Sequence, residues 1–575
     1  MSIDYGRLRQ SCSRPDIANE LAEFADETGR VAFGICSDSN GLHTDYGLVG
    51  GLSDAFARSW QCFSYGFNSC MRPRNRYAHM SATNLWWPRY STSNPTGGET
   101  TYWPYTNGTS AADGLTVVQA GVLTNYVPRS GDRFYVSAGS SGIIIGEYDV
   151  NPATTVAATG TIGITASCGA LKTGIFGFVN SASGGTSNSG IAAAYSRGWN
   201  FKREWLGIGG GAYHKASGTA FLQNYNEFFA HKNGLLPYNG TMIAVAYSLS
   251  ETGGATRIDL CRCTIDAGSV NVIANATLTG SGSAATWQAV RATLAASDRT
   301  TSHADEAILW GTDLGAGHTG PISALGCALF NGDMTRGVSV SALACLGGAS
   351  AYDLAKFWGD ADDNSIDNLV RTMADQCAVA NGGTGTVRCC ILINYGFNDQ
   401  GETVNDYRGD GNPSYSTAGY VSNIRYTVER LQARWNSVRG ANASDTELYF
   451  AFVPSHPVSD SPATSKSTPP NTSDNGDRQR WTNDYYLAIA SYAQSLPKAF
   501  AIDLYTALGP SAYARLNDAR MTYTKDADVT HLMPAGYNLV GAKIAEVMRA
   551  KSRNVVAVHT SYVPERKKRM LFENT

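Results

Sequence analysis

The sequence predicts an α/β protein in which a doubly wound parallel sheet of five strands is interrupted by a β-rich insertion. Two observations predict this fold. Short apolar runs of strand length alternate with helical patterns near the N-terminus and again after residue 335, as in chains of βαβ units. Between residues 81 and 335, Gly, Ser, Thr and Ala dominate and short β-type runs are separated by turn residues, which is typical of a β-sandwich or jelly roll.

The first part of the parallel sheet is predicted around one strand at residues 31–35, whose continuous apolar run indicates burial on both faces. Apolar residues at helical spacing predict one helix before this strand and one after it. Pro15 fits the first turn of the earlier helix, because that position needs no backbone N–H. The two helical stripes consist of Ile17, Leu21 and Phe24, and of Leu48, Leu52 and Phe56.

The remaining four strands are expected after residue 335, each separated from the next by a helix. The strands are predicted at residues 338–346, 387–394, 448–453 and 499–504. Amphipathic helices are predicted at residues 366–377, 420–438 and 481–493, and a last one from Pro534 to residue 548. Because residues 81–335 separate the first strand from the second, the simplest account is a β domain inserted into an α/β domain.

The expected organisation therefore has four parts. Residues 1–80 form the first part of the α/β domain, 81–335 the inserted β-rich domain, 336–555 the second part of the α/β domain, and 556–575 a basic C-terminal tail. Within the insertion, the clearest β-type runs lie at residues 142–150, 241–249 and 256–265. The 30 tyrosines and 11 tryptophans of the chain suit sugar stacking, and they suit any β-rich domain equally well.

Composition argues against several classes of function. The net charge of −3 gives no reason to expect nucleic acid as a partner, and no apolar stretch reaches the roughly 20 residues that a bilayer span needs. The 12 cysteines include no Cys-x-x-Cys pair, so no zinc site, no dithiol redox site and no cofactor are expected. The N-terminus lacks the apolar core of a signal peptide, so we expect no secretory signal.

Polar loops follow the predicted strands, where an open α/β sheet gathers its active groups. A serine hydroxyl is a weak nucleophile unless a nearby base takes its proton. Among the 9 histidines, only His531 lies in a loop before a predicted helix and has an acid, Asp528, three residues before it in the sequence. We expect four loops to converge: Ser37 to Asn40, Gly347 to Ser350, Gly396 to Asp399, and Asp528 to His531.

These loops predict an acyl-transfer site with Ser39 as the nucleophile and His531 as its base. Asp528 is expected to bond one imidazole nitrogen and so fix the tautomer. The tetrahedral oxyanion needs donors fixed in advance, and the backbone N–H groups of Ser39 and Gly348 and the side-chain amide of Asn398 are candidates. Each residue also has an ordinary interpretation, as a helix cap, a polar residue at a helix start or a turn former.

The four loops resemble, in chain order, the four signature blocks of the SGNH (GDSL-type) hydrolases. Ser37-Asp38-Ser39 corresponds to Gly-Asp-Ser, Gly348 to the glycine of the second block, Gly396 to Asp399 to Gly-x-Asn-Asp, and Asp528 to His531 to Asp-x-x-His. The similarity covers about residues 30–60 and 336–550 and leaves out the insertion. One position departs from the family pattern. Ser37 stands where the family has glycine, and its side chain could crowd the turn and displace Ser39.

The resemblance implies a flavodoxin-like sheet and a serine esterase, with Ser39 as nucleophile, His531 as base, and Gly348 and Asn398 completing the oxyanion hole. Family members hydrolyse lipids, thioesters, acetylated sugars and small esters, so the family does not choose the substrate. Members with large β insertions and no signal peptide look like carbohydrate deacetylases of bacteriophage tails, commonly homotrimers that act at the bacterial surface. By that analogy the expected partner is an acylated polysaccharide or glycan, above all an O-acetylated one. Without a virion the expected location is cytoplasmic.

Two other interpretations stay open at this point. The first is a non-catalytic carbohydrate- or receptor-binding protein on a hydrolase scaffold that has lost activity, which the Ser37 departure permits. The second is a lipase, which would need a wide apolar groove or lid that the sequence does not show.

An acidic run also invites a calcium site, but it lacks the glycine and the terminal glutamate of a calcium loop, so we expect the start of a helix there. The run consists of Asp360, Asp362, Asp363 and Asp367.

Overall fold

The computed structural model describes residues 10–41, 47–59, 63–67, 335–345, 349–381, 383–440, 443–455, 467–470, 475–508, 522–524, 528–532 and 534–550, together with the strands between residues 115 and 331. Gly348 and the predicted basic tail at residues 556–575 lie outside the described residues. For Ser39, Asp528 and His531 the backbone is described and the side chain is not.

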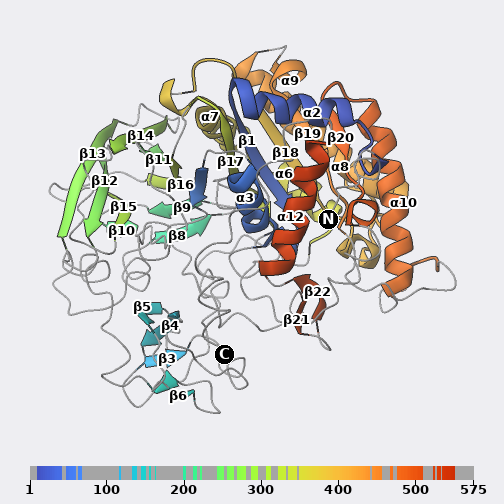
Figure 1. Ribbon diagram of the computed structural model, residues 1–575, viewed down its shortest axis with the longest axis horizontal. Helices are drawn as coiled ribbons and strands as arrows, with labels where there is room; N and C mark the ends of the chain where they lie inside the picture. The colour runs from blue at the N-terminus through green and yellow to red at the C-terminus, as the bar shows by residue number, and fades with distance from the viewer. Residues whose placement is uncertain are drawn as a thin grey trace, which may run out of the picture.

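A five-stranded parallel sheet forms the centre of the protein (Figure 1). Every neighbouring pair in it is parallel. Numbered along the chain, these five strands have the order 2-1-3-4-5, as in flavodoxin-like sheets, and β2 adds a sixth parallel strand beside β17. The predicted five-stranded parallel sheet is confirmed. Across the sheet, its strands are β17 (Gly337–Cys345), β1 (Arg30–Ser37), β18 (Arg388–Asn394), β19 (Leu448–Phe452) and β20 (Ala499–Ala501).

Helices flank both faces of this sheet (Figure 1). Ala32 and Cys36 of β1 belong to a core cluster with α6 (Ala351–Asp360), α7 (Asp363–Cys377), α8 (Thr417–Arg439) and α10 (Asn475–Gln494). Phe33 lies on the opposite face of β1, since side chains alternate along a strand, and its ring centroid is 4.8 Å from that of Phe56 in α3 (Gly47–Ser59). On the same face, α12 (Pro534–Met548) packs against α3, and α2 (Pro15–Glu23) packs against α12.

The sheet continues beyond β17 through strands drawn from the middle of the chain. β2 (Phe63–Phe67) pairs parallel with β17, and β16 (Ile322–Asn331) then pairs antiparallel with β2. β11 (Met242–Ser250) and β14 (Thr286–Leu294) follow in antiparallel pairing. β9 (Ala212–Lys215) joins β16, and β8 (Trp199–Lys202) joins β9.

Three further antiparallel sheets are formed by described strands between residues 115 and 312. The runs predicted at residues 142–150, 241–249 and 256–265 are strands, namely β5, β11 and β12. The division of the chain at residues 80 and 335 stays a prediction. The strands are β10 (Ala220–Leu222), β15 (Glu306–Thr312), β12 (Ala255–Thr264) and β13 (Ser269–Thr279) in one sheet, β3 (Leu115–Val117), β4 (Arg133–Ala138) and β5 (Ile144–Asp149) in the next, and β6 (Thr155–Val156) with β7 (Ile162–Gly163).

The antiparallel extension is anchored to α7 by polar contacts. Tyr247 of β11 donates a hydrogen bond to Asp375 Oδ2 at 2.8 Å, and Arg291 of β14 forms an ion pair with the same carboxylate. Trp287 Nε1 donates to Thr372 Oγ1 at 2.9 Å. Burial raises the pKa of Asp375 even though Arg291 and Tyr247 favour its charged form. Strands of the predicted insertion therefore pack directly on a helix of the parallel sheet.

The remaining described elements are short. None of the described helices has both the length and the apolar character needed to cross a membrane. The short elements are η1 (Phe24–Thr28), η2 (Ser39–Gly41), η10 (Val379–Asn381), η11 (Asn398–Gly401), α9 (Ala443–Thr446), β21 (Thr522–Thr524) and β22 (Asp528–Leu532).

Candidate active site

The candidate site lies at the carboxyl edge of the parallel sheet. β1 ends at Ser37 and is followed by Asp38 and the turn η2, while β18 ends at Asn394 and is followed by η11. Gly396 has a φ of 130°, so the chain between β18 and η11 uses a backbone conformation that favours glycine. Carboxyl ends of parallel strands gather the active groups of open α/β sheets.

Ser37, which stands where the resembled signature has glycine, has a hydrogen-bond partner at this edge. It is fully buried and pairs in register with Asn394 of β18. Its hydroxyl donates to Asn394 Oδ1 at 2.9 Å, and Asn394 Nδ2 in turn donates to the carbonyl of Val453 at 2.7 Å. The extra side chain therefore has a hydrogen-bond partner and ties β1 to β18.

Ser37→Gly should lower the free energy of unfolding by about 1–2 kcal/mol, because it leaves the buried Asn394 oxygen unpaired and frees the backbone. Any ester hydrolysis should stay close to the wild-type rate, since glycine is the family residue at this turn. Urea unfolding and an ester assay measure the two effects. A large rise in activity would show instead that Ser37 displaces Ser39.

Asp38 and Asn398 hold the turns after β1 and β18 together. Asp38 is buried, and its Oδ1 accepts from Asn40 N at 2.9 Å and from Asn40 Nδ2 at 3.0 Å. Asn398 Nδ2 lies 3.5 Å from Asp38 Oδ2 and donates to Ala349 O at 3.1 Å. The amide of Asn398 thus contacts the residue before Ser39 and the residue after Gly348. Three predicted segments of the site meet at this amide.

The fourth predicted segment lies next to the turn that carries Ser39. β22 (Asp528–Leu532) comes within 8 Å of η2 (Ser39–Gly41), measured between Cα atoms. The helix that follows, α12, supplies Tyr537, whose hydroxyl donates to Asn40 Oδ1 at 2.9 Å. Backbones that are far apart in sequence therefore meet here. The side-chain geometry of the triad Ser39, Asp528 and His531 stays a prediction.

One local prediction at this segment was wrong. Residues 528–531 were expected in a loop, whereas they belong to the strand β22, which pairs antiparallel with β21. Val529 and Thr530 are β-branched and favour extended backbone, which gives a physical reason for the strand.

Two acids beside the site accept hydrogen bonds from the backbone at the start of α6. Asp353 Oδ2 accepts from Ser350 N at 2.9 Å, and Ser350 Oγ accepts from Asp353 N at 3.4 Å, which completes a capping box at the start of α6. Asp399 Oδ1 accepts from Ala351 N at 2.8 Å. Asp399 is fully buried, and burial raises its pKa to about 8. That burial could not be predicted, because an Asp in a Gly-x-Asn-Asp turn can equally face solvent.

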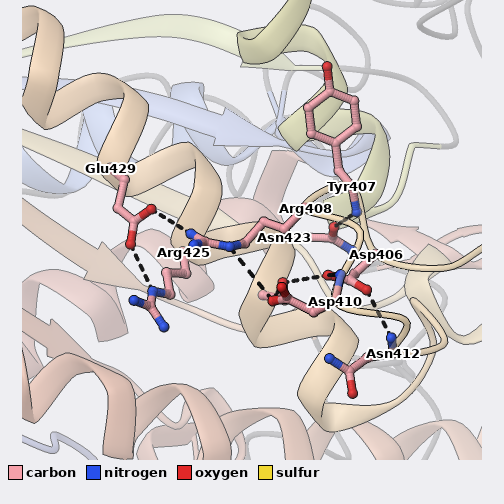
Figure 2. Close-up of polar contacts among 9 residues, drawn as sticks. Asp406, Tyr407, Arg408, Asp410, Asn412, Asn423, Arg425 and Glu429 are labelled. Atoms are coloured by element: carbon pink, nitrogen blue, oxygen red, sulfur yellow. Dashed lines mark hydrogen bonds and ion pairs between the residues drawn. The ribbon is translucent and has the colours of Figure 1, made fainter.

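The turn after η11 carries a second set of polar contacts, shown in Figure 2. Asp406 accepts from Asn412 N at 2.9 Å, from Asp410 N at 3.2 Å and from the Ser422 hydroxyl at 2.7 Å. Burial would raise the pKa of Asp406, but these hydrogen bonds outweigh it and hold the pKa below its usual value. The oxygens of Asp406 thus accept hydrogen bonds from the backbone of the turn and from Ser422 of α8.

Glu429 of α8 bridges two arginines at the same place, Arg408 Nη1 at 2.5 Å and Arg425 Nε at 2.8 Å (Figure 2). Tyr407 N donates to Asn423 Oδ1 at 2.8 Å, again between the turn and α8. The contacts of Asp406 and Glu429 fix the turn that borders η11, and this gives the region a structural role.

No group of three or more His, Cys, Asp or Glu side chains that could hold a metal ion occurs in the described part of the chain. In the acidic run, Asp362 caps α7 by accepting from Ser365 N at 2.9 Å, as expected for a helix start. Arg434 pairs with Asp363 at 2.5 Å and with Asp367 at 2.6 Å, so the run is neutralised by α8.

No family model and no curated protein match the chain. Several solved structures are weakly similar to it, including the following three. Xylanase 10B of Clostridium thermocellum (CBM22-1 and GH10 modules, complexed with xylohexaose) is 9% identical, over 52% of this chain and 69% of that chain, with a TM-score of 0.17. The mannan-recognising carbohydrate-binding module TmCBM27 is 12% identical, over 24% and 84%, with a TM-score of 0.15. A family two carbohydrate esterase from Cellvibrio japonicus is 11% identical, over 52% and 96%, with a TM-score of 0.12. Scores at this level assign neither a fold nor an activity to the chain.

Proposed function

We propose that the protein is a serine esterase of the SGNH-hydrolase type that removes acyl groups, above all O-acetyl groups, from a polysaccharide. The observation that supports this most is the meeting of segments at the sheet edge. Asn398 contacts the turn of Ser39 and the segment that follows Gly348, and β22 lies beside η2. Because β1 and β18 are parallel, the turns that follow them lie at the same edge of the sheet, and this supports a site there.

In the proposed mechanism, Ser39 Oγ attacks the ester carbonyl while His531 takes its proton and Asp528 holds the imidazole in place. The negative oxygen that forms is stabilised by the backbone N–H groups of Ser39 and Gly348 and by the amide of Asn398. His531 then gives its proton to the departing sugar hydroxyl. Water, activated by the same histidine, hydrolyses the acyl-enzyme and frees the acid.

The polysaccharide part of the proposal depends on the insertion at residues 81–335. A β-rich module with many aromatic residues is a suitable surface for sugar rings, and attached to an esterase it would hold a polymer near the site. The proposal therefore names an O-acetylated polysaccharide as the substrate class.

The test is incubation of the purified protein with p-nitrophenyl acetate and with O-acetylated polysaccharides. We expect p-nitrophenol release, and loss of mass from the polysaccharide corresponding to acetyl groups in mass spectra. Binding of a polysaccharide without hydrolysis of any ester would contradict the esterase and favour the non-catalytic binding protein. Hydrolysis of long-chain esters in preference to acetyl esters would favour a lipase.

A further inference from the structure

Three hydrogen bonds join the turn after β18 to the segment that leads into α6. Asn398 and Asp399 are neighbours in η11, so two of these bonds come from adjacent residues. Asp399 is 0% exposed, which makes its contact the most shielded from water. The bonds are Asn398 Nδ2 to Ala349 O at 3.1 Å, Ala351 N to Asp399 Oδ1 at 2.8 Å, and Ser350 Oγ to Glu402 Oε2 at 3.3 Å.

The surroundings of Asp399 favour its neutral form. The charged groups that act on it most are Asp38 at the end of β1 and Asp353 on α6, and both are negative. Tyr420 of α8 and Tyr485 of α10 also lie near enough to sense its charge. Asp399 Oδ2 has no hydrogen-bond partner among the described residues. Burial and the two carboxylates together raise the pKa of Asp399 to about 8, so the side chain is mostly protonated at neutral pH.

We propose that Asp399 is a positioning residue of the esterase site, which in its neutral form holds the segment after Gly348 at a fixed distance from Asn398. The inference rests on the proposed function, because these two residues are the proposed oxyanion donors. A carboxylate at position 399 would place a second negative charge near Asp38, whose oxygens hold Asn40 and Asn398. Repulsion between the two acids would then separate the turns.

Asp399→Asn and Asp399→Ala separate positioning from charge. Asparagine keeps the acceptor for Ala351 N and cannot ionise, so its kcat at pH 7 should stay close to wild type. Alanine removes the contact, and kcat should fall by about 10²-fold with little change in KM, as expected when a site is displaced by about 1 Å. Wild-type kcat should decline above pH 8, where Asp399 loses its proton, and the asparagine variant should not show this decline.

Two measurements test the contact without any catalysis. The folded protein holds the Asp399 proton more tightly than the unfolded chain, so wild-type stability should fall as pH rises from 3.8 to about 8 and then level off with respect to this group. Asp399→Asn should weaken that dependence. Hydrogen exchange of the Ala351 amide should be slow in wild type and in the asparagine variant, and fast in the alanine variant.

Asp362→Asn is the matched control, because the hydrogen bonds of Asp362 stay within the first turn of α7. This variant should keep the wild-type decline of kcat above pH 8 and the slow hydrogen exchange of the Ala351 amide. The positioning role would be overturned if kcat of Asp399→Asn declined above pH 8 as in wild type. It would also be overturned if Asp399→Ala kept the wild-type kcat and the slow exchange of the Ala351 amide. Absence of ester hydrolysis by wild type would refute the proposed function instead, and the exchange data would still decide whether Asp399 holds the segment.

Discussion

Ser39→Ala should lower kcat for p-nitrophenyl acetate by about 10⁴-fold or more while the protein stays folded. The reason is that alanine removes the attacking oxygen, so any remaining hydrolysis relies on water and the oxyanion donors. The turn η2 is held by hydrogen bonds from Asn40 N and Asn40 Nδ2 to Asp38 Oδ1, and we expect these to remain in the variant. Initial rates at saturating substrate measure the effect, and the thermal midpoint reports the fold.

Ser53→Ala provides the matched control for this substitution. Ser53 lies on α3, and its hydroxyl donates to the Val49 carbonyl one turn earlier at 2.7 Å. The loss of that hydroxyl should change neither kcat nor KM. Equal rates for Ser39→Ala and wild type would remove Ser39 from the mechanism and leave the polysaccharide-binding protein as the better account.

Combining Ser39→Ala with His531→Ala tests whether the two residues act as one unit. If His531 serves only to take the proton of Ser39, the double variant should be about as slow as either single variant, because groups that act together are strongly non-additive. Multiplicative losses would show that the two residues act independently. This test probes the triad through rates rather than through side-chain positions.

The parallel sheet could be predicted because buried parallel strands leave a simple trace in sequence. β1 and β17 are buried at every residue, and most of their residues are apolar. The strand β2 was not predicted. Its sequence, FSYGF, is short and contains a glycine, and its partners β17 and β16 lie more than 250 residues further along the chain. Pairing over such separations is not visible in local patterns.

The position of the site could be predicted further than its chemistry. The loops after β1 and β18 were expected to converge, and the contact between Asp38 and Asn398 joins them. The burial of Asp399 and the link from Tyr537 to Asn40 could not be predicted, since both depend on how α6 and α12 pack against the sheet edge. The strand at residues 528–531 was not predicted, because a four-residue segment is too short to show a clear hydrophobic period.

The packing of α12 against α3 leads to the largest stability effect that we expect. Gly51 of α3 and Gly541 of α12 lie at the crossing of the two helices. A Cβ atom on Gly51 would be 2.1 Å from the carbonyl oxygen of Tyr537, and one on Gly541 would be 2.3 Å from that of Gly51. Both obstacles are backbone atoms, so no side-chain rotation can relieve them and the helices must separate.

Gly51→Ala should therefore lower the free energy of unfolding by about 3 kcal/mol, the upper end of the usual cost of overpacking. Alanine favours helix over glycine by up to about 1 kcal/mol, which offsets only part of that cost. Gly50→Ala, the half-buried neighbour on the same helix, is the control and should be neutral or slightly stabilising. Urea unfolding of the two variants measures the difference.

The same substitution should also reduce ester hydrolysis in the protein that remains folded. α12 carries Tyr537, which bonds to Asn40 in the turn of Ser39, and α12 begins two residues after the strand that contains His531. A shift of α12 by about 1 Å would therefore move the proposed base relative to the nucleophile, and such displacements can lower rates by about 10²-fold. If Gly51→Ala lost stability but kept the wild-type kcat, the position of α12 would not control the site, and the link from Tyr537 to Asn40 would be structural alone.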